Sequence, residues 1–414
     1  MSRKYDIILF GATGFTGALT CEYLLQNAER SVKWALAGRN LAKLEAVRER
    51  LTSIDESAKN LDLVIADSSR PDTLEEAVGS TRVVISTVGP FTKYGTPLVE
   101  ACVKHKTHYV DITGEFGWIK SIIDKFDKQA KENHVMIVPA CGFDSVPSDM
   151  GTFMVCDYLR KERNLDTLEV KASLVKVSGG ASGGTLHSCI EAVTDPSLPV
   201  SASMDPYFLS PIRGIDKAYF PIMKRDRDFG KNWQAYFFMA VTNEKVVRRS
   251  WGLWTNRGYG YGRLFRYREH ITLPFLPALI VSALVLFAPL ATLLLRIDFF
   301  KRVALKCLPS SGTGPSREQL ESGHLEMHFI ATAETEPYDE PVRVRGIVKG
   351  FKDPGYGDTC RMVAESALSI VKSYDQLPGK EGGVLTSASA FGNTLLERLR
   401  ANNGMVFEVQ EMHK

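Results

Sequence analysis

The stretch Tyr5–Gly17, YDIILFGATGFTG, decides the fold of the N-terminal part of the chain. Asp6–Phe10 is a short apolar run of the kind that forms a buried parallel strand, and it leads directly into Gly11, Gly14 and Gly17. The order of strand, tight turn and helix is typical of a dinucleotide-binding βαβ unit. The spacing GxxGxxG is a variant of the more familiar GxGxxG, and a plain glycine-rich turn is the alternative.

Each glycine has a physical role in such a unit. Gly11 allows a turn where a Cβ would clash, Gly14 allows the backbone to approach a pyrophosphate, and Gly17 allows the next helix to pack close to the strand. A helix over about residues 15–26 then points its unpaired N–H groups and its positive dipole end at the phosphates. The pattern therefore predicts a nucleotide site.

The end of the next strand indicates which nucleotide binds. Val32–Ala37 is followed by Gly38 and Arg39, at a position where NAD enzymes usually carry an acid for the ribose hydroxyls. Arg39, with Lys43 one turn into the following helix, would instead pair with a 2′-phosphate. We therefore expect NADP as the cofactor, with NAD as the alternative. The interpretation without a function is that Arg39 is simply a solvated arginine at the start of a helix.

The alternation of strands and helices continues to about residue 150. Further strands are expected at 61–66, 83–88, 108–112 and 135–139, each separated from the next by a helical pattern. Asp67 follows the third strand, where the adenine would lie, and Gly89-Pro90 follows the fourth and presents backbone to the crevice. The sequence thus predicts a Rossmann-type domain over residues 1–150 with a doubly wound parallel sheet.

The regular alternation of predicted strands and helices ends in the second half of the chain. Residues 169–177, 325–334 and 342–351 alternate polar and apolar side chains with period two, as half-exposed antiparallel strands do, and 358–373 reads as a helix. We expect an α+β domain over residues 151–414 and assign it the substrate and any homodimer contact.

Composition excludes several classes of protein. The 414 residues carry a net charge of +3 without an extended Lys/Arg stripe, so no nucleic-acid partner is expected. Seven cysteines without metal-ligand spacing indicate buried thiols in a reducing compartment, neither a disulfide framework nor a metal site. The first strand begins at once, so no cleaved targeting peptide is expected.

Leu273–Leu295 is a run of 23 residues without a charge, which meets the length and composition of a bilayer-spanning helix. A span would separate strands of one domain, so we favour a proline-bent insertion that enters and leaves from one face, with basic flanks at anionic headgroups. A buried core or dimer-interface segment is the alternative. We accordingly expect membrane association on a cytosolic face, at a lipid droplet, the endoplasmic reticulum or the mitochondrial outer surface.

Reduction with a nicotinamide requires a proton source. Asp111 and Glu115 lie at the carboxyl end of one strand, from which we expect their side chains to point into the cleft. Asp144 lies in the loop that opens the helix crossing into the second domain. His187 ends the glycine-rich stretch 178–187, which is able to wrap a ligand. We select Asp111, Asp144 and His187 as catalytic candidates. The alternative for Asp144 is that it caps this helix, as Ser145 and Ser148 are also able to do. A satisfied structural histidine is the alternative for His187, and Cys141 is expected to be a packed thiol.

The motifs GATGFTG, AGRN, STVGPFTKYG, YVDITGE and GFDSVPSD occur in this order, and with them the chain resembles the saccharopine dehydrogenase-like oxidoreductases and, more distantly, the trans-acting enoyl reductases of bacterial lipid synthesis. The similarity includes the late GYGDTCRMVAESAL and GGVLTSASAFG segments. It implies an NAD(P)-binding fold, oxidoreductase activity and, as in several eukaryotic members, association with membranes or lipid droplets. By position it implies that Arg39 binds the ribose phosphate and that Val88, Gly89 and Pro90 line the nicotinamide side. It also implies that the pyrophosphate is lined by Gly11, Thr13, Gly14, Phe15, Thr16 and Gly17.

The family name alone does not give the substrate. A polar amino-acid substrate would leave the apolar run without a purpose, whereas a lipid-borne substrate would use it. We expect a reductase of a hydrophobic carbonyl or enoyl compound. An amino-acid or imine dehydrogenase and a non-catalytic nucleotide-binding scaffold on a lipid surface are the alternatives.

Overall fold

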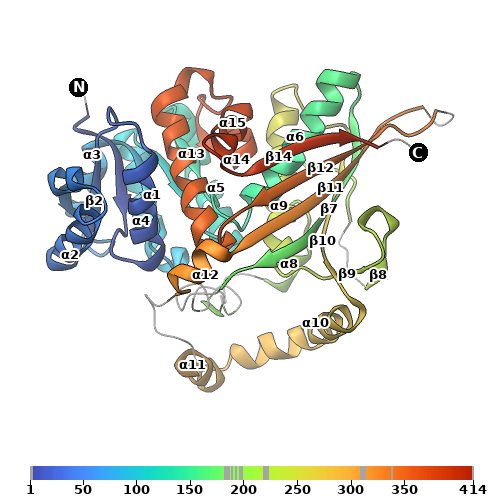
Figure 1. Cartoon of the computed structure of the whole chain (residues 1–414), viewed down its shortest axis with the longest axis horizontal. Coiled ribbons are helices and arrows are strands. Elements are labelled where there is room, and N and C mark those ends of the chain that lie inside the picture. Colours follow the sequence, from blue (N-terminus) through green and yellow to red (C-terminus); the bar gives the residue numbers. More distant parts are fainter. Residues whose placement is uncertain are drawn as a thin grey trace.

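Two seven-stranded sheets organise the computed structural model (Figure 1). The structure describes residues 3–180, 187, 190–191, 194, 199–217, 223–307, 314–336 and 339–412. The first sheet and its helices form one side of the molecule and the second sheet the other (Figure 1).

The first sheet has the strand order β13-β6-β5-β4-β1-β2-β3, and all of its pairings are parallel. Its N-terminal strands are β1 (Tyr5–Phe10), β2 (Trp34–Gly38), β3 (Asp62–Ile65), β4 (Thr81–Ser86), β5 (His108–Asp111) and β6 (Met136–Val138). The helices between them are α1 (Phe15–Asn27), α2 (Leu41–Thr52), α3 (Pro71–Gly79), α4 (Phe91–His105) and α5 (Phe116–Glu132). The doubly wound α/β domain is confirmed, and the strand order reverses between β1 and β4.

The central strand β1 shows why an apolar run forms this sheet. Ile7 and Leu9 point into the hydrophobic core on one face, while Ile8 and Phe10 point into the core on the other face. All four side chains are buried. A strand covered by helices on both faces needs continuous rather than alternating hydrophobicity, which is the pattern at the start of the chain.

The C-terminal part of the chain completes the first sheet, which the sequence did not reveal. β13 (Gly383–Val384) pairs with β6, and α13 (Thr359–Ser373) packs beside α1 against β4 and β5. The boundary expected near residue 150 therefore describes the order along the chain, but not the membership of the sheet. The crossing between the two sheets is made by α6 (Val146–Arg163).

The second sheet has the order β14-β12-β11-β7-β10-β9-β8. Its strands are β7 (Thr167–Ser178), β8 (Lys224–Arg225), β9 (Trp233–Ala235), β10 (Arg266–Leu273), β11 (His324–Ala333), β12 (Arg343–Gly350) and β14 (Val406–Glu411). β7 and β10 are parallel, and the other neighbours are antiparallel. One face packs on α6 and α9 (Ala240–Asn256), so the predicted period-two strands β7, β11 and β12 are confirmed. Shorter helices are α8 (Val200–Met204), α12 (Arg317–Ser322), α14 (Ser387–Phe391) and α15 (Asn393–Arg400).

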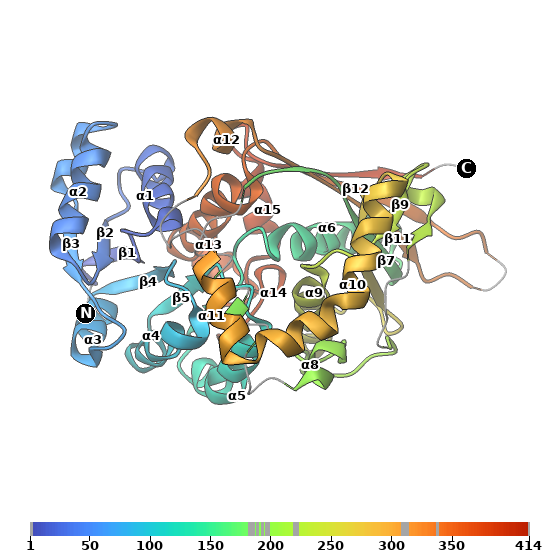
Figure 2. The same cartoon turned by 90° about the horizontal axis from the view of Figure 1, so that it is seen from below.

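The uncharged run forms α10 (Phe275–Leu295), which is followed by α11 (Asp298–Cys307). Figure 1 shows both helices below the body of the molecule, and Figure 2, which is seen from below, shows them crossing its near face. Among the described residues, no helix combines the length and the continuous apolar run of a bilayer span. The sheet topology also argues against a single crossing of the bilayer by this segment. β10 before the segment and β11 after it both pair with β7, and a crossing would separate them.

Candidate functional site

The glycine-rich turn lies where β1 ends, beside the end of β4. Gly11 has a φ of +95°, and a Cβ at this residue would come within 2.7 Å of Thr87 Oγ1 and Val88 Cγ2. A Cβ at Gly17 would overlap the carbonyl group of Gly11. Only glycine fits at both positions, so α1 is able to start directly against the strand. The turn also brings Val88 next to the glycines, as the resemblance implied.

The start of α1 fits a pyrophosphate. Gly14 is the N-cap of α1 and supplies no side-chain hydrogen bond, and its own N–H donates to the carbonyl oxygen of Gly11 at 2.9 Å. Thr13 is exposed, and Phe15 and Thr16 are partly exposed along the same turn. A helix N-terminus behind a backbone turn without bulky side chains is suited to a dinucleotide diphosphate. The predicted pyrophosphate residues therefore lie together on one turn.

The ends of β2 and β3 place Arg39 close to Asp67. Asp67 accepts hydrogen bonds from the N–H and the Oγ of Ser69 at 2.9 and 2.8 Å, and these bonds, with the nearby Arg39 charge, hold the pKa of Asp67 below its usual value. Arg39 is exposed, and no carboxylate of the described residues lies within ion-pair distance of it. A guanidinium in this position fits the 2′-phosphate of NADP.

The start of α4 is fixed by Glu115. Its carboxylate accepts hydrogen bonds from the N–H groups of Phe91 and Thr92, both at 2.8 Å. The expectation that Glu115 points into the cleft is therefore wrong, because the unpaired N–H groups of a helix start bind this carboxylate. These two hydrogen bonds attach Glu115 to the residues that directly follow Gly89 and Pro90. Gly89 and Pro90 are joined by a cis peptide bond.

Asp111 is fully buried at the end of β5. Its carboxylate accepts hydrogen bonds from Thr113 N at 2.9 Å, Ala140 N at 3.0 Å and Tyr109 Oη at 2.8 Å. Burial raises its pKa to about 7, against the effect of these hydrogen bonds. This arrangement joins the ends of β5 and β6 and suits a positioning role, whereas direct catalysis by Asp111 stays a prediction.

Asp144 follows β6 and is only half-buried. Its Oδ2 lies against Gly114, where a Cβ would come within 2.8 Å of it, and among the described residues no donor forms a hydrogen bond with the carboxylate. Burial raises the pKa of Asp144 to about 6. The hydroxyl of Thr242 donates to Gly114 O at 3.0 Å, so α9 of the second domain reaches the same place. Asp144 thus presents a carboxyl without a described partner at the place where the two domains meet.

The capping alternative for this loop is wrong. Ser145 is the N-cap of α6, but its side chain makes no cap hydrogen bond and donates instead to Asn243 Oδ1 at 3.2 Å. Asn243 Nδ2 donates to Glu269 Oε1 at 2.8 Å and to Ser148 Oγ at 3.2 Å, and Tyr267 Oη donates to Glu269 Oε2 at 2.8 Å. Burial raises the pKa of Glu269 to about 7. This buried network behind Asp144 has no sequence signature, because its members come from α6, α9 and β10.

His187 is helical and half-buried, and its catalytic role stays a prediction. Residues 181–186 of the glycine-rich stretch lie outside the described residues. Cys141 is the packed thiol that was expected, since it is fully buried and burial raises its pKa to about 12. Within the described ranges, no group of His, Cys, Asp and Glu is arranged to hold a metal ion.

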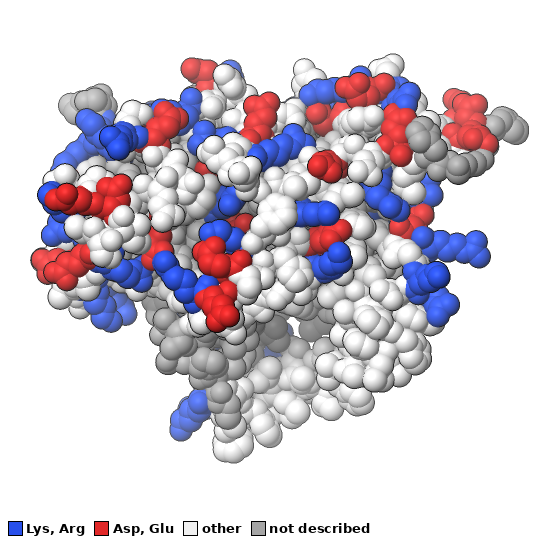
Figure 3. All heavy atoms as spheres, in the orientation of Figure 1, with Lys and Arg blue, Asp and Glu red and all other residues white. Residues whose placement is uncertain are grey.

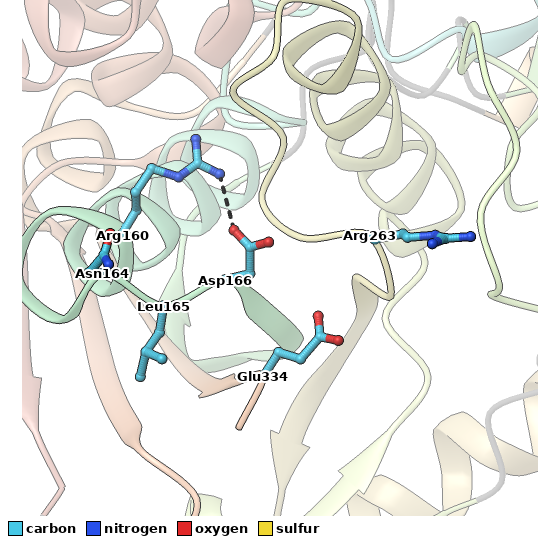
Figure 4. Close-up of a pocket in the computed structure, with 6 residues that line it drawn as sticks. All are labelled: Arg160, Asn164, Leu165, Asp166, Arg263 and Glu334. Atoms are coloured by element: carbon cyan, nitrogen blue, oxygen red, sulfur yellow. Dashed lines mark ion pairs between the residues drawn. The ribbon is translucent and has the colours of Figure 1, made fainter. Parts of the chain in front are cut away.

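A surface hollow of 540 Å³ lies at the far end of the second sheet (Figure 4). Figure 4 shows that Arg160 and Asp166 form an ion pair across it, at 3.5 Å, while Arg263 points away. It is lined by Arg160, Asn164, Leu165, Asp166, Arg263 and Glu334. None of these residues follows a strand of the first sheet, so the hollow is separate from the candidate site.

Comparisons with known proteins agree with this geometry. Residues 7–138 match the model of the saccharopine dehydrogenase NADP binding domain. The structure is similar to saccharopine dehydrogenase (L-Glu forming) from Saccharomyces cerevisiae, with a TM-score of 0.56 over 99% of this chain and 100% of that chain, at 11% sequence identity. A similarity at this identity shows the shared fold.

Relatives of higher identity cover the whole chain. A trans-acting enoyl reductase of Mycobacterium tuberculosis is 36% identical over an alignment of 417 positions, gaps included, that covers 96% of this chain and 96% of the relative. A trans-acting enoyl reductase of Mycobacterium ulcerans is 35% identical over 428 aligned positions that cover 99% of this chain and 99% of the relative. The protein is thus an NADP-binding oxidoreductase, and the chain belongs to the trans-acting enoyl reductases within the saccharopine dehydrogenase-like family.

Proposed function

We propose that the protein is an NADP-dependent reductase that acts at a lipid surface on a hydrophobic enoyl or carbonyl substrate. The observation that carries this proposal is the half-buried carboxyl of Asp144 after β6, which forms no hydrogen bond with any residue that the structure describes. Asp144 lies at the edge of the first sheet where the parallel strands end, and Val88, Gly89 and Pro90 follow a strand at the same edge. The nicotinamide is expected there. The names of the relatives support an enoyl substrate.

Asp144 is the group best placed to deliver a proton. The bound cofactor supplies a hydride to one carbon of the substrate double bond, and a proton must reach the other reacting atom. With a pKa raised to about 6, Asp144 keeps a protonated fraction near neutral pH. Asp111 is less suited, because its oxygens already accept three hydrogen bonds and its side chain is buried. His187 stays the alternative donor.

The exposed apolar surfaces of α10 and α11 favour a hydrophobic substrate. Their exposed large apolar side chains include Leu276, Leu284, Leu286, Phe287, Leu293 and Phe299, which are between 63% and 70% exposed. Soluble monomers rarely expose a contiguous apolar patch larger than a few hundred Å². A hollow of 320 Å³ opens at the junction of β10 and α10 and is lined partly by Leu174, Ile271 and Leu273.

This surface supports insertion of α10 and α11 into one leaflet, from the cytosolic side of a membrane or lipid droplet. α10 remains attached to the body through its first turns, because Ala278 is fully buried and the ring of Phe275 lies against that of Trp233, with the ring centroids 5.5 Å apart. Contact on one face and exposure on the others suits a helix that lies in an interface. A second copy of the chain covering the same surface would be the homodimer alternative.

A reconstituted assay tests the proposal. NADPH oxidation is followed with a long-chain enoyl thioester in phospholipid vesicles, and in parallel with an imine formed from a 2-oxo acid and an amino acid. We expect oxidation with the enoyl compound and a much lower rate for Asp144→Asn. Turnover of the imine alone would favour the amino-acid dehydrogenase, and NADPH binding without any turnover would favour the scaffold. Light scattering in mild detergent distinguishes a monomer from a homodimer.

A further inference from the structure

Two of the basic residues that flank the apolar run in the sequence already pair with acids, and a third lies far from α10. Lys301 forms an ion pair with Glu191 at 2.9 Å, and Arg268 forms one with Asp216 at 3.2 Å. Arg266 begins β10, whereas Leu273 ends it at the start of α10. Arg266 therefore lies at the opposite end of an eight-residue strand, more than about 20 Å from α10. Arg296, Arg302 and Lys306 follow the other end of α10, so cations at its start must come from elsewhere in the second sheet.

Strand register places a different basic group at the start of α10. In the second sheet, Arg225 of β8 is opposite Trp233 of β9, and Trp233 is opposite Leu273 of β10. These residues therefore lie at the level where β10 ends and α10 begins. Lys224 precedes Arg225 in β8, and Lys231 precedes Trp233 by two residues in the hairpin loop. We call Lys224, Arg225, Lys231 and Trp233 the basic hairpin.

The side chains of the basic hairpin connect it to α10. The guanidinium of Arg225 lies over the ring of Trp233 at 4.8 Å, and Trp233 in turn contacts Phe275, the first residue of α10. Tryptophan is enriched at the boundary between apolar chains and headgroups. A cation stacked on its outer side would lie at headgroup depth when Phe275 faces the acyl chains.

The charge of the basic hairpin is not balanced locally. Lys224, Arg225 and Lys231 are exposed, and within the described residues none of them forms an ion pair. The two acids of the hairpin face inward, since Asp226 pairs with Lys171 at 2.8 Å and Asp228 pairs with Arg343 at 2.6 Å. Figure 3 shows Lys and Arg side chains projecting at the right, above a lower part of the molecule that is mostly uncharged. The hairpin thus presents positive charge next to an apolar helix.

We propose that the basic hairpin binds the headgroups of anionic phospholipids. This inference rests on the proposed function, because it requires α10 to lie on a lipid surface, and it adds which lipid that surface contains. Each Lys or Arg near an anionic surface contributes about 1 kcal/mol, which is about fivefold in affinity. Three such residues beside one inserted helix would give a strong preference for anionic over neutral lipid.

Vesicle flotation tests this inference. The full chain is mixed with vesicles of phosphatidylcholine alone, or with vesicles in which about a third of it is replaced by phosphatidylserine. The test variant combines Lys224→Gln, Arg225→Gln and Lys231→Gln. A control with the same net charge combines Arg30→Gln, Lys33→Gln and Lys59→Gln, which are exposed residues around α1, β2 and η1 (Glu56–Asn60). A second variant, Leu284→Ser with Leu286→Ser and Phe287→Ser, tests insertion itself. NADPH binding checks that each variant is folded.

The wild type and the control are expected to bind phosphatidylserine vesicles at least about tenfold more tightly than neutral ones, in a salt-dependent manner. The basic-hairpin variant should lose this preference and keep its binding to neutral vesicles. Equal binding of the wild type to both vesicles, or an unchanged preference in the variant, would overturn the inference alone. Absence of wild-type binding to either vesicle would overturn the lipid-surface part of the proposed function as well.

Discussion

Lys301 of α11 forms an ion pair with Glu191 at 2.9 Å, and Glu191 also accepts a hydrogen bond from Lys93 of α4 at 2.8 Å. Lys93 lies three residues after Pro90, which is expected to line the nicotinamide side of the site. The exposed apolar helices are thus joined by one carboxylate to the helix that follows the Gly89-Pro90 loop.

Glu191→Gln should loosen this connection. A partly exposed ion pair contributes about 0.2–1 kcal/mol, so we expect little change in overall stability but faster amide hydrogen exchange in α11. Hydrogen exchange followed by mass spectrometry measures the effect. Glu132→Gln, which breaks a surface ion pair with Lys128 on α5, is the matched control and should leave α11 unchanged. Equal exchange in α11 of the wild type and Glu191→Gln would show that the pair does not hold the helix.

Asp144→Asn should lower kcat by about 10²–10⁴-fold, because the amide cannot donate the proton, while the affinity for NADPH stays within about twofold. The wild-type rate should fall as pH rises above about 6, since the protonated carboxyl is the active form and its pKa lies near 6. Single-turnover rates as a function of pH measure both effects. A variant that keeps the same pH dependence would assign the proton to another group, with His187→Gln as the next variant to measure.

Arg39→Asp should change the choice of cofactor. Loss of a charge-assisted contact to the 2′-phosphate, and repulsion by the new carboxylate and Asp67, should weaken NADPH binding by about 10–100-fold. NADH has no 2′-phosphate and should bind with nearly unchanged affinity. Fluorescence titration with both nucleotides provides the measurement. A parallel loss for the two nucleotides would place Arg39 outside the phosphate contact.

Gly17→Ala should abolish cofactor binding. The added methyl group would overlap the carbonyl group of Gly11, so the turn and α1 would have to move apart. Gly79→Ala is a suitable control, because a Cβ there would meet only His105 Nδ1 at 3.5 Å, an ordinary contact distance. Circular dichroism and NADPH titration compare the two variants. Normal NADPH affinity in Gly17→Ala would mean that the close packing of strand and helix is not required.

Local patterns in the sequence predicted much of this structure. The apolar run and glycines of residues 5–17 predicted β1, the turn and α1, because these features are determined by neighbouring residues. The period-two alternation likewise predicted β7, β11 and β12. β13 is only two residues long and pairs with β6 across most of the chain, so it carries no local signal.

In the candidate site, too, contacts between residues far apart in the sequence carried no local signal. Arg39 was selected because it follows a predicted strand at a position with a known chemical role, and its contact with the cofactor phosphate stays a prediction. The partners of Ser145 and Ser148 were not found, because Asn243 and Glu269 are about 100 residues away in the chain and have no recognisable spacing. Glu115 was misassigned, since its contact with the start of α4 depends on how β4 and β5 pair.

The buried carboxyl of Glu269 should make stability fall as pH rises. Its pKa is raised by burial from an ordinary value near 4.5 to about 7, so the folded state holds a proton that the unfolded state releases in this interval. The stabilisation from this proton is complete below about pH 4.5 and is lost as pH approaches 7, a change of about 3 kcal/mol for one group. Asp111 and Asp149, whose pKa values burial also raises to about 7, act in the same direction.

Glu269→Gln separates the contribution of this carboxyl from those of Asp111 and Asp149. The amide oxygen still accepts from Asn243, and the amide nitrogen is able to donate to Tyr267 Oη, so the network is largely kept. We expect the free energy of unfolding in urea to depend less on pH between about 5 and 8 in the variant, by about 2–3 kcal/mol. A pH dependence equal to that of the wild type would mean that Glu269 is already ionised in the folded protein, held by the donors of Asn243, Ser148 and Tyr267.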